Sequence, residues 1–212
     1  MGNQTKPCLR SWERFFLNLS IGFFPPVAFL IVGWWGSIPF VSEGLIPYFA
    51  IGGLLLGILM DRVFLRKWVR QALSMSWIWP VLEYFFYSVC AFGFFMGVPL
   101  PNFALGPLAG MYVGLRIRST EERERQLIAR QASVFTAAVL FFFCAASLLI
   151  ASLDAYLEAN IQGLLGLRHP LTRGLILLIA AAAGLLLVWI EYHVTLHIVK
   201  IVSGATLPPK DK

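Results

Sequence analysis

The positions of the basic residues constrain this chain more than any other feature of its sequence. All but two of the seventeen Lys and Arg residues fall into four clusters, and two apolar stretches joined by a loop separate each cluster from the next. The clusters are Lys6, Arg10 and Arg14; Arg62, Arg66, Lys67 and Arg70; Arg116, Arg118, Arg123, Arg125 and Arg130; and Lys200, Lys210 and Lys212. Cytoplasmic loops of membrane proteins carry an excess of Lys and Arg. The pattern therefore predicts an all-α, polytopic integral membrane protein with six transmembrane helices and with both termini in the cytoplasm.

The composition agrees with a chain embedded in lipid. Charged residues make up 13% of the sequence, whereas soluble domains carry about 25%. The 212 residues are enough for one bundle of about six helices with short loops, so we expect a single transmembrane domain over residues 1–212. The net charge of +6 lies in the flanks of the spans, where it contacts anionic lipid headgroups. Membrane lipids are therefore expected partners, and nucleic acid is not.

Runs of apolar residues place the six spans. About 20 helical residues cover the hydrocarbon core of a bilayer. Pro25 and Pro26 interrupt the first span, and because proline has no N–H to donate, a kink or break is expected there. We expect a multi-pass protein of the cell inner or plasma membrane. The spans lie at about 15–35, 45–60, 77–97, 100–115, 132–153 and 174–190, and a cytoplasmic helical extension follows at about 191–202.

Spans two, four and six carry small residues at four-residue spacing. This spacing lets helix backbones approach closely, which is a main source of packing energy in lipid. We predict that these three spans form the inner core of the bundle. The alternative is that Gly and Ala are simply common in membrane spans. The residues are Gly53 and Gly57; Gly106, Gly110 and Gly114; and Ala180 and Gly184.

Two segments of the chain resemble each other. Residues 47–54 (PYFAIGGL) and 101–108 (PNFALGPL) are identical at five of eight positions. Further along, residues 70–72 and 130–132 both read Arg-Gln-Ala. Both copies would enter the membrane from the same side, so the pattern indicates a parallel two-helix repeat. Chance similarity between apolar segments is the alternative explanation.

Glu83 is an acidic residue well inside an apolar span. A charge at the middle of a membrane costs about 2.5–3.5 kcal/mol on insertion scales. Ser76 and Tyr87 lie at spacings that place them on the same face of span three as Glu83. The functional hypothesis is a binding site for a small solute or an ion. The alternative is a protonated Glu that is hydrogen-bonded for packing.

A second candidate site lies on the extension of the sixth span. His193 and His197 are four residues apart, and Glu191 is close by in the sequence. Two His side chains at this spacing can chelate a metal, and a carboxylate would complete a set suited to iron or zinc. One His could also be an axial haem ligand. The alternative is an ordinary interfacial helix, so haem or metal is a secondary hypothesis and no cofactor is favoured.

The leading functional hypothesis is a small membrane transporter, or a membrane-embedded subunit of a transporter complex, that binds a small solute or ion. One alternative is the membrane anchor of a redox complex that binds haem, metal or quinone. Another is a non-catalytic accessory or assembly subunit, whose partners would be other membrane subunits or a second copy of the chain. The sequence contains no P-loop and no dinucleotide-binding fingerprint. An enzyme is therefore not favoured.

Overall fold

The computed structural model describes residues 10–166 and 171–204 of the chain. Within those ranges every regular element is a helix, so the predicted all-α class is confirmed. Of the basic residues, Lys6, Arg168, Lys210 and Lys212 lie outside the described ranges.

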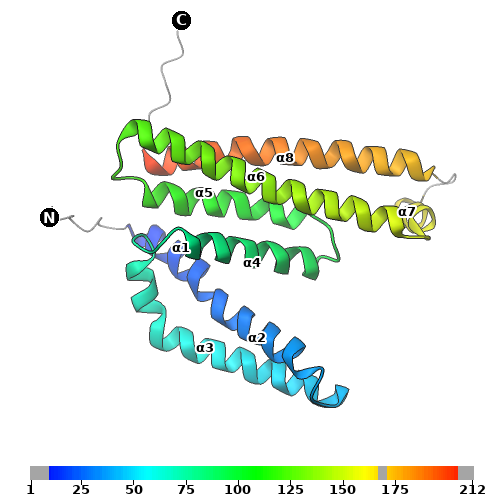
Figure 1. Ribbon diagram of the computed structural model, residues 1–212, viewed down its shortest axis with the longest axis horizontal. Helices are drawn as coiled ribbons and strands as arrows, with labels where there is room; N and C mark the ends of the chain where they lie inside the picture. The colour runs from blue at the N-terminus through cyan, green and yellow to red at the C-terminus, as the bar shows by residue number, and fades with distance from the viewer. Residues whose placement is uncertain (1–9, 167–170, 205–212) are drawn as a thin grey trace, which may run out of the picture. The chain divides into compact units, whose positions relative to one another are not determined.

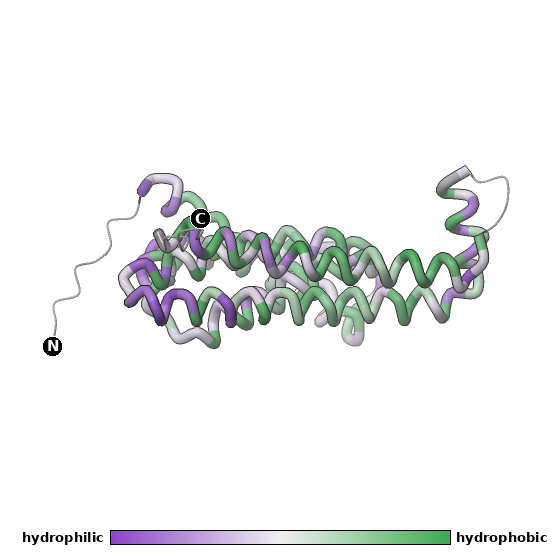
Figure 2. The backbone as a smooth tube through the Cα atoms, turned by 90° about the horizontal axis from the view of Figure 1, so that it is seen from above, coloured by the Kyte–Doolittle hydropathy of each residue, from purple (hydrophilic) through white to green (hydrophobic). Residues whose placement is uncertain are grey.

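Four stretches of the described residues are long and apolar enough to cross a membrane. Figure 2 shows hydrophobic residues along the long helices and hydrophilic residues gathered toward helix ends. This arrangement is that of a membrane protein, with four candidate spans rather than the six expected. The stretches are Ser11–Ser37, Glu43–Gln71, Glu122–Leu153 and Arg173–Ser203.

The helices form two compact units, Met1–Ser76 and Trp77–Lys212, here named the first unit and the second unit. The expectation of one domain over the whole chain stays a prediction. The first unit contains α1 (Ser11–Gly22), α2 (Phe24–Ser37), the short 3₁₀ helix η1 (Glu43–Leu45) and α3 (Ile46–Gln71). The second unit contains α4 (Ile78–Phe94), the 3₁₀ helix η2 (Leu100–Ala104), α5 (Leu105–Arg116), α6 (Glu122–Leu153), α7 (Leu157–Leu165) and α8 (Arg173–Ser203), as Figure 1 shows.

The first unit is a helical hairpin that is interrupted where the sequence predicts. Helix α1 ends at Gly22, and α2 begins two residues later with Pro25 and Pro26 in its first turn. Because neither proline has an N–H, the carbonyl groups of Ile21 and Gly22 lack the donors that a continuous helix would supply. The two prolines therefore separate the apolar N-terminal stretch into α1 and α2.

Helices α2 and α3 pack with their backbones in direct contact. A Cβ atom placed on Gly53 would lie 2.2 Å from the carbonyl oxygen of Phe29, and one on Gly57 would lie 2.5 Å from Cα of Pro26. The contact also involves a glycine of α2, because a Cβ on Gly33 would lie 2.4 Å from the carbonyl oxygen of Phe49 in α3. Such distances admit only glycine, so these residues set the spacing of the hairpin.

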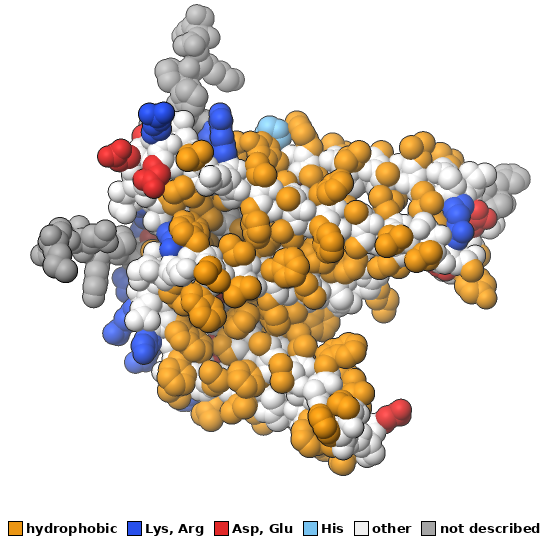
Figure 3. Space-filling view, in the orientation of Figure 1, with side chains coloured by type: hydrophobic (Ala, Val, Ile, Leu, Met, Phe, Trp, Pro, Cys, Tyr) orange, Lys and Arg blue, Asp and Glu red, His pale blue; other side chains and the backbone are white. Residues whose placement is uncertain are grey.

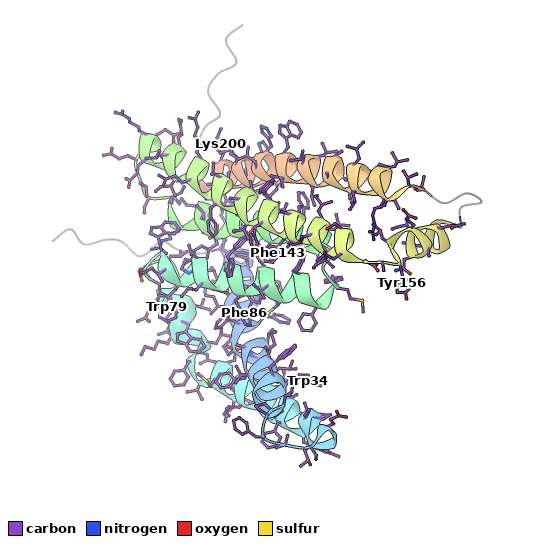
Figure 4. All side chains as sticks on the ribbon, turned by 45° about the vertical axis from the view of Figure 1, so that its right-hand side comes forward. Trp34, Trp79, Phe86, Phe143, Tyr156 and Lys200 are labelled. Atoms are coloured by element: carbon purple, nitrogen blue, oxygen red, sulfur yellow. The ribbon has the colours of Figure 1, made fainter. Side chains whose placement is uncertain are left out.

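The second unit packs α5, α6 and α8 against one another (Figure 1). Aromatic rings join α4 to α6. Phe143 projects from α6 (Figure 4), and its ring centroid lies 4.9 Å from that of Phe92 and 6.5 Å from that of Phe85. Phe143 is buried and Phe92 is half-buried, whereas Phe85 is exposed, so the cluster extends from the interior of the unit to its surface.

Basic residues collect at one end of the second unit, where α5 ends, α6 begins and α8 ends (Figures 1 and 3). Arg118 donates through Nε and Nη2 to the carbonyl oxygen of Val202, at 3.3 and 3.2 Å, and Arg125 donates through Nη1 to that of Ser203, at 3.1 Å. The last carbonyl groups of a helix have no partners within the helix, so these guanidinium groups cap α8. The cluster that contains Arg118 and Arg125 thus lies at the same end of the unit as Lys200 near the end of α8, as the charge pattern requires. The side of the membrane on which they lie stays a prediction.

Several boundaries differ from those expected. Helix α3 continues to Gln71 and α6 runs unbroken from Glu122, so both helices extend beyond the second and fifth spans expected at about 45–60 and 132–153. In contrast, α4 has 17 residues and α5 has 12. At about 1.5 Å per residue they extend about 25 and 18 Å, which is less than the roughly 30 Å of a hydrocarbon core. The third and fourth spans therefore stay predictions.

The chain turns between α4 and α5 through residues that cannot continue a helix. Met96 and Gly97 have φ angles of 54° and 81°, in the left-handed region that ends helices. Pro99 and Pro101 follow, and both lack an N–H donor. These residues limit the lengths of both helices.

The two copies of the candidate repeat have different backbone structures. Residues 47–54 lie within α3, whereas residues 101–108 are divided between η2 and α5. Likewise, residues 70–72 lie at the end of α3, whereas residues 130–132 lie inside α6. The repeat therefore stays a prediction.

The turn between α4 and α5 tests the number of spans. Met96 is 92% exposed, and the six-span topology places it outside the cell. In a chain whose native cysteines are replaced by serine, Met96→Cys should react with a membrane-impermeant maleimide applied to intact cells. Ser42→Cys should react in the same way, and Ser119→Cys only after permeabilisation. Protection of Met96→Cys in intact cells would contradict six spans.

Neighbouring glycines of α3 provide a matched test of the hairpin seam. Gly53→Ala should lower the free energy of unfolding by about 1–3 kcal/mol, because the new methyl group overlaps the backbone of α2. Gly52 has no atom within 4 Å of its Cβ position, so Gly52→Ala should raise stability by about 0.5–1 kcal/mol through its better helix propensity. Unfolding in detergent mixtures measures both. Equal effects at the two positions would show that the seam does not form.

Candidate functional site

Polar side chains are buried along the interior of the second unit. In a bundle surrounded by lipid, buried polar groups must find their partners within the protein. The elements that supply them are α4, η2, α6 and α8. The residues are Tyr84, Ser88, Asn102, Ser133, Thr136, Glu191 and Thr195.

The buried face of α8 lies against the glycines of α5. Glu191, Thr195 and Val199 recur every four residues, and all three are 0% exposed, as expected for one face of a helix. A Cβ atom on Gly106 would lie 1.7 Å from Oε1 of Glu191, and one on Gly110 would lie 3.1 Å from the carbonyl oxygen of Thr195. The missing side chain of Gly106 is therefore what makes room for the carboxyl group.

Glu191 is the most unusual side chain in this interior. Both of its carboxyl oxygens are buried and form no hydrogen bond within the described structure. Tyr84 of α4 interacts with it electrostatically, so the group lies between α8, α5 and α4. A buried carboxylate without a partner costs several kcal/mol in solvation energy. An ionisable residue at such a place in a membrane protein is by default a candidate functional group.

Hydrogen bonds tie the surrounding helices together. Oγ1 of Thr136 in α6 donates to Oγ1 of Thr195 in α8 at 3.3 Å. Nδ2 of Asn102 in η2 donates to the carbonyl oxygen of Ser88 in α4 at 2.7 Å, while Oδ1 of Asn102 is buried without a partner. The interior thus offers hydroxyl, amide and carboxyl oxygens, which are ligands suited to a proton or a hard cation.

Of the two residues predicted to share a helical face with Glu83, only Tyr87 lies in the same helix. Ser76 precedes α4 and belongs to the first unit, whereas Glu83 and Tyr87 lie in α4. The buried face of α4 is formed by Tyr84 and Ser88, one residue further along. Glu83 is half-buried, and its Oε1 atom is buried without a partner. Its role as a binding residue stays a prediction.

Glu83 lies near a cluster of aromatic and basic side chains. It interacts electrostatically with Tyr112 of α5. The hydroxyl group of Tyr112 accepts a hydrogen bond of 3.4 Å from Nη1 of Arg116, and this guanidinium lies 3.9 Å above the ring of Trp77. Trp77 and Arg116 place this cluster at the start of α4 and the end of α5, and Glu83 itself is next in sequence to Tyr84, which interacts with Glu191.

The structure separates the two histidines from Glu191. His193 and His197 are exposed, whereas Glu191 is buried on the other side of α8. The His193 ring contacts the rings of Trp189 and Tyr192, at centroid distances of 4.6 and 5.2 Å. No group of three or more His, Cys, Asp or Glu side chains that could hold a metal occurs among the described residues. The two-His, one-carboxylate set of the metal hypothesis is therefore not assembled.

The small residues singled out in the sequence have different neighbours. Gly53 and Gly57 contact α2, and Gly106, Gly110 and Gly114 contact α8. A Cβ atom on Gly184 of α8 would lie 3.3 Å from Cβ of Cys144 in α6, and Ala180 is exposed. Of the proposed inner core, the contact between spans four and six is present. A core that also includes span two stays a prediction.

Sequence reasoning did not single out most of the buried polar residues. Glu191 was expected only as a metal ligand. The residues that were not expected to belong to a site are Tyr84, Asn102, Thr136 and Thr195. A signal for Thr195 was present, because Thr195 follows Glu191 by four residues and must share its face. No comparable signal indicated Asn102, whose neighbours depend on the turn between α4 and α5.

No family model, curated protein or solved structure matches this chain.

The hydrogen bond of Asn102 can be tested by truncation. Asn102 is 2% exposed, and Asn102→Ala should lower the free energy of unfolding by about 0.5–1.5 kcal/mol through loss of the bond to Ser88. Asn160 is exposed, so Asn160→Ala should change stability by less than about 0.5 kcal/mol. Unfolding in detergent mixtures measures the stability of both variants. Equal losses of stability would show that the hydrogen bond of Asn102 does not stabilise this interior.

Proposed function

We propose that this protein is a small membrane transporter, or a membrane-embedded subunit of a transporter complex, that binds a small solute together with a cation. The observation that carries the proposal is Glu191, a fully buried carboxyl group with two unpartnered oxygens. It lies in α8, which is long and apolar enough to cross a membrane. Ionisable groups in such positions are costly, and they mark the pathways of substrates, ions and protons.

The surroundings of Glu191 support a binding role. Tyr84, Thr136 and Thr195 bring hydroxyl groups from three different helices into the same interior. Sites for small ligands commonly lie between the helices of bundles, where a few polar groups converge. A set of groups from separate helices can also change when those helices move, as transport requires.

The contact between α5 and α8 supports such movement. Gly106, Gly110 and Gly114 present no side chains to α8, and the side chains that they meet, those of Glu191, Ile198 and Val202, all belong to α8. Small sliding movements of packed helices are an established way of opening and closing sites. We propose that α5 and α8 slide along this contact during transport.

The outer surface supports a location within lipid. Hydrophobic side chains cover most of the visible face in Figure 3. In the second unit, Phe141, Phe142, Leu185, Leu186 and Trp189 are all exposed, as expected for residues that contact lipid. The proposal includes six spans, cytoplasmic termini and the cell inner or plasma membrane, on the basis of the charge pattern.

Neither alternative has an observation of comparable weight. For a redox anchor, the exposed His193 and His197 would have to bind haem, metal or quinone without Glu191. For an accessory subunit, exposed apolar side chains could contact a partner, but they equally suit lipid. The unpartnered carboxyl group is explained by neither.

Solute binding and uptake test the proposal. The full-length protein is screened for thermal stabilisation by a panel of amino acids, nucleosides, vitamins and organic cations. Uptake of each radiolabelled hit into proteoliposomes is then measured. Uptake should exceed that of protein-free vesicles, and Glu191→Gln should reduce it at least about tenfold, which corresponds to about 1.4 kcal/mol.

Glu124 provides the matched control, because it is an exposed acid at the start of α6. Glu124→Gln should transport at the rate of the unmodified protein. The proposal is wrong if no solute in the panel is accumulated, or if Glu191→Gln and Glu124→Gln transport equally well.

A further inference from the structure

The carboxyl group of Glu191 lies against the backbone of α5 at Gly106. The Cβ position of Gly106 is 1.7 Å from Oε1, 2.3 Å from Cδ and 2.6 Å from Oε2. Both oxygens are therefore at contact distance from the same glycine, which closes that side of the carboxyl group. A hard metal ion such as Ca²⁺ or Mg²⁺ needs roughly six oxygen ligands around it. A proton needs one oxygen and no additional volume.

The groups around Glu191 are neutral. They are Tyr84 of α4, which interacts with it electrostatically, Gly106 of α5, which lies against its carboxyl group, and Thr195, one turn further along α8, whose hydroxyl group lies 3.3 Å from that of Thr136. The two histidines of α8 lie on its exposed side.

An ionised Glu191 would therefore lack both hydrogen bonds and a counter-ion in this packing. Such a charge is strongly disfavoured in a low-dielectric interior. The neutral carboxylic acid is the form that fits.

We propose that Glu191 binds and releases one proton, and that this proton is the cation coupled to solute movement. The second half of this inference rests on the proposed transport function, and the first half does not. On binding, one carboxylate oxygen takes up a proton and becomes a neutral acid. On release, the carboxylate regains one negative charge, and the proton passes to water.

The contact at Gly106 couples release of the proton to a movement of α5. A carboxylate needs water or hydrogen-bond donors, and within the described structure this fully buried group has no hydrogen-bond partner while the backbone of α5 lies against it. Release of the proton therefore requires α5 to move away from Glu191 at Gly106. The closed contact between α5 and α8 is the protonated state, and separation of the two helices accompanies deprotonation.

Infrared spectroscopy of the full-length protein in lipid nanodiscs tests the proton site without reference to transport. At neutral pH the spectrum should contain the C=O stretching band of a protonated carboxyl group. This band should lose a component in Glu191→Gln and be unchanged in Glu124→Gln. Absence of any such component specific to Glu191 would overturn the proposal.

A second variant keeps the test decisive if Glu191→Gln does not fold. Gly106→Ala retains the acid but places a methyl group against it, so the band assigned to Glu191 should shift in frequency. An unshifted band would contradict the contact on which the inference rests. Thermal stabilisation by Na⁺ that Glu191→Gln abolishes would assign the site to a metal cation and would likewise overturn the proton assignment.

The two proposals fail in different ways. If the band of Glu191 is present but no solute is accumulated, the proton site stands and the transport function is wrong. If uptake depends on Glu191 but no protonated carboxyl band does, transport stands and the proton assignment is wrong.

Discussion

The contact between the backbone of Gly106 and the carboxyl group of Glu191 determines the arrangement of the second unit's interior. Helices in lipid gain little from the hydrophobic effect, because the surrounding chains are as apolar as their side chains. Close backbone packing and internal hydrogen bonds must hold them together instead. At Gly106 the same contact brings α5 onto α8 and encloses a carboxyl group between them. Any larger residue there would have to displace either the helix or the acid.

The first unit uses the same physical principle without the polar group. Gly33, Gly53 and Gly57 bring α2 and α3 into backbone contact, and the atoms that they meet belong to the main chain. This seam fixes the geometry of a hairpin and offers no side-chain chemistry. In the first unit the Cβ position of Gly22 lies 3.1 Å from Oδ2 of Asp61, which is only half-buried, whereas Glu191 beside Gly106 in the second unit is fully buried. That difference is why the candidate site lies in the second unit.

Several features could be predicted from the sequence because they depend on composition or on local chemistry. The apolar runs predicted helices suited to a membrane, and Pro25 and Pro26 predicted the interruption between α1 and α2. The lengths of α4 and α5 were less accessible. They depend on where the backbone enters the left-handed region at Met96 and Gly97. A methionine in the sequence does not predict that conformation.

The candidate site shows where sequence reasoning was incomplete. Glu191 and His193 are close in sequence, but at about 100° per residue they lie about 200° apart around a helix. Their separation could thus have been derived in advance, and the metal hypothesis overlooked it. Glu83 drew attention because it lies inside an apolar run, yet the buried face of its helix carries Tyr84 and Ser88.

The sequence alone determined that the chain is helical and apolar, which glycines permit close approach, and which residues share a face with Glu191. These properties follow from side-chain chemistry and from the period of the helix. Only the tertiary structure decided that the atoms opposite Gly106 are the oxygens of Glu191, and that Tyr84, Asn102 and Thr136 surround the same interior. Pairing of helices far apart in the chain depends on how whole surfaces fit together. No periodicity within a single helix specifies that fit.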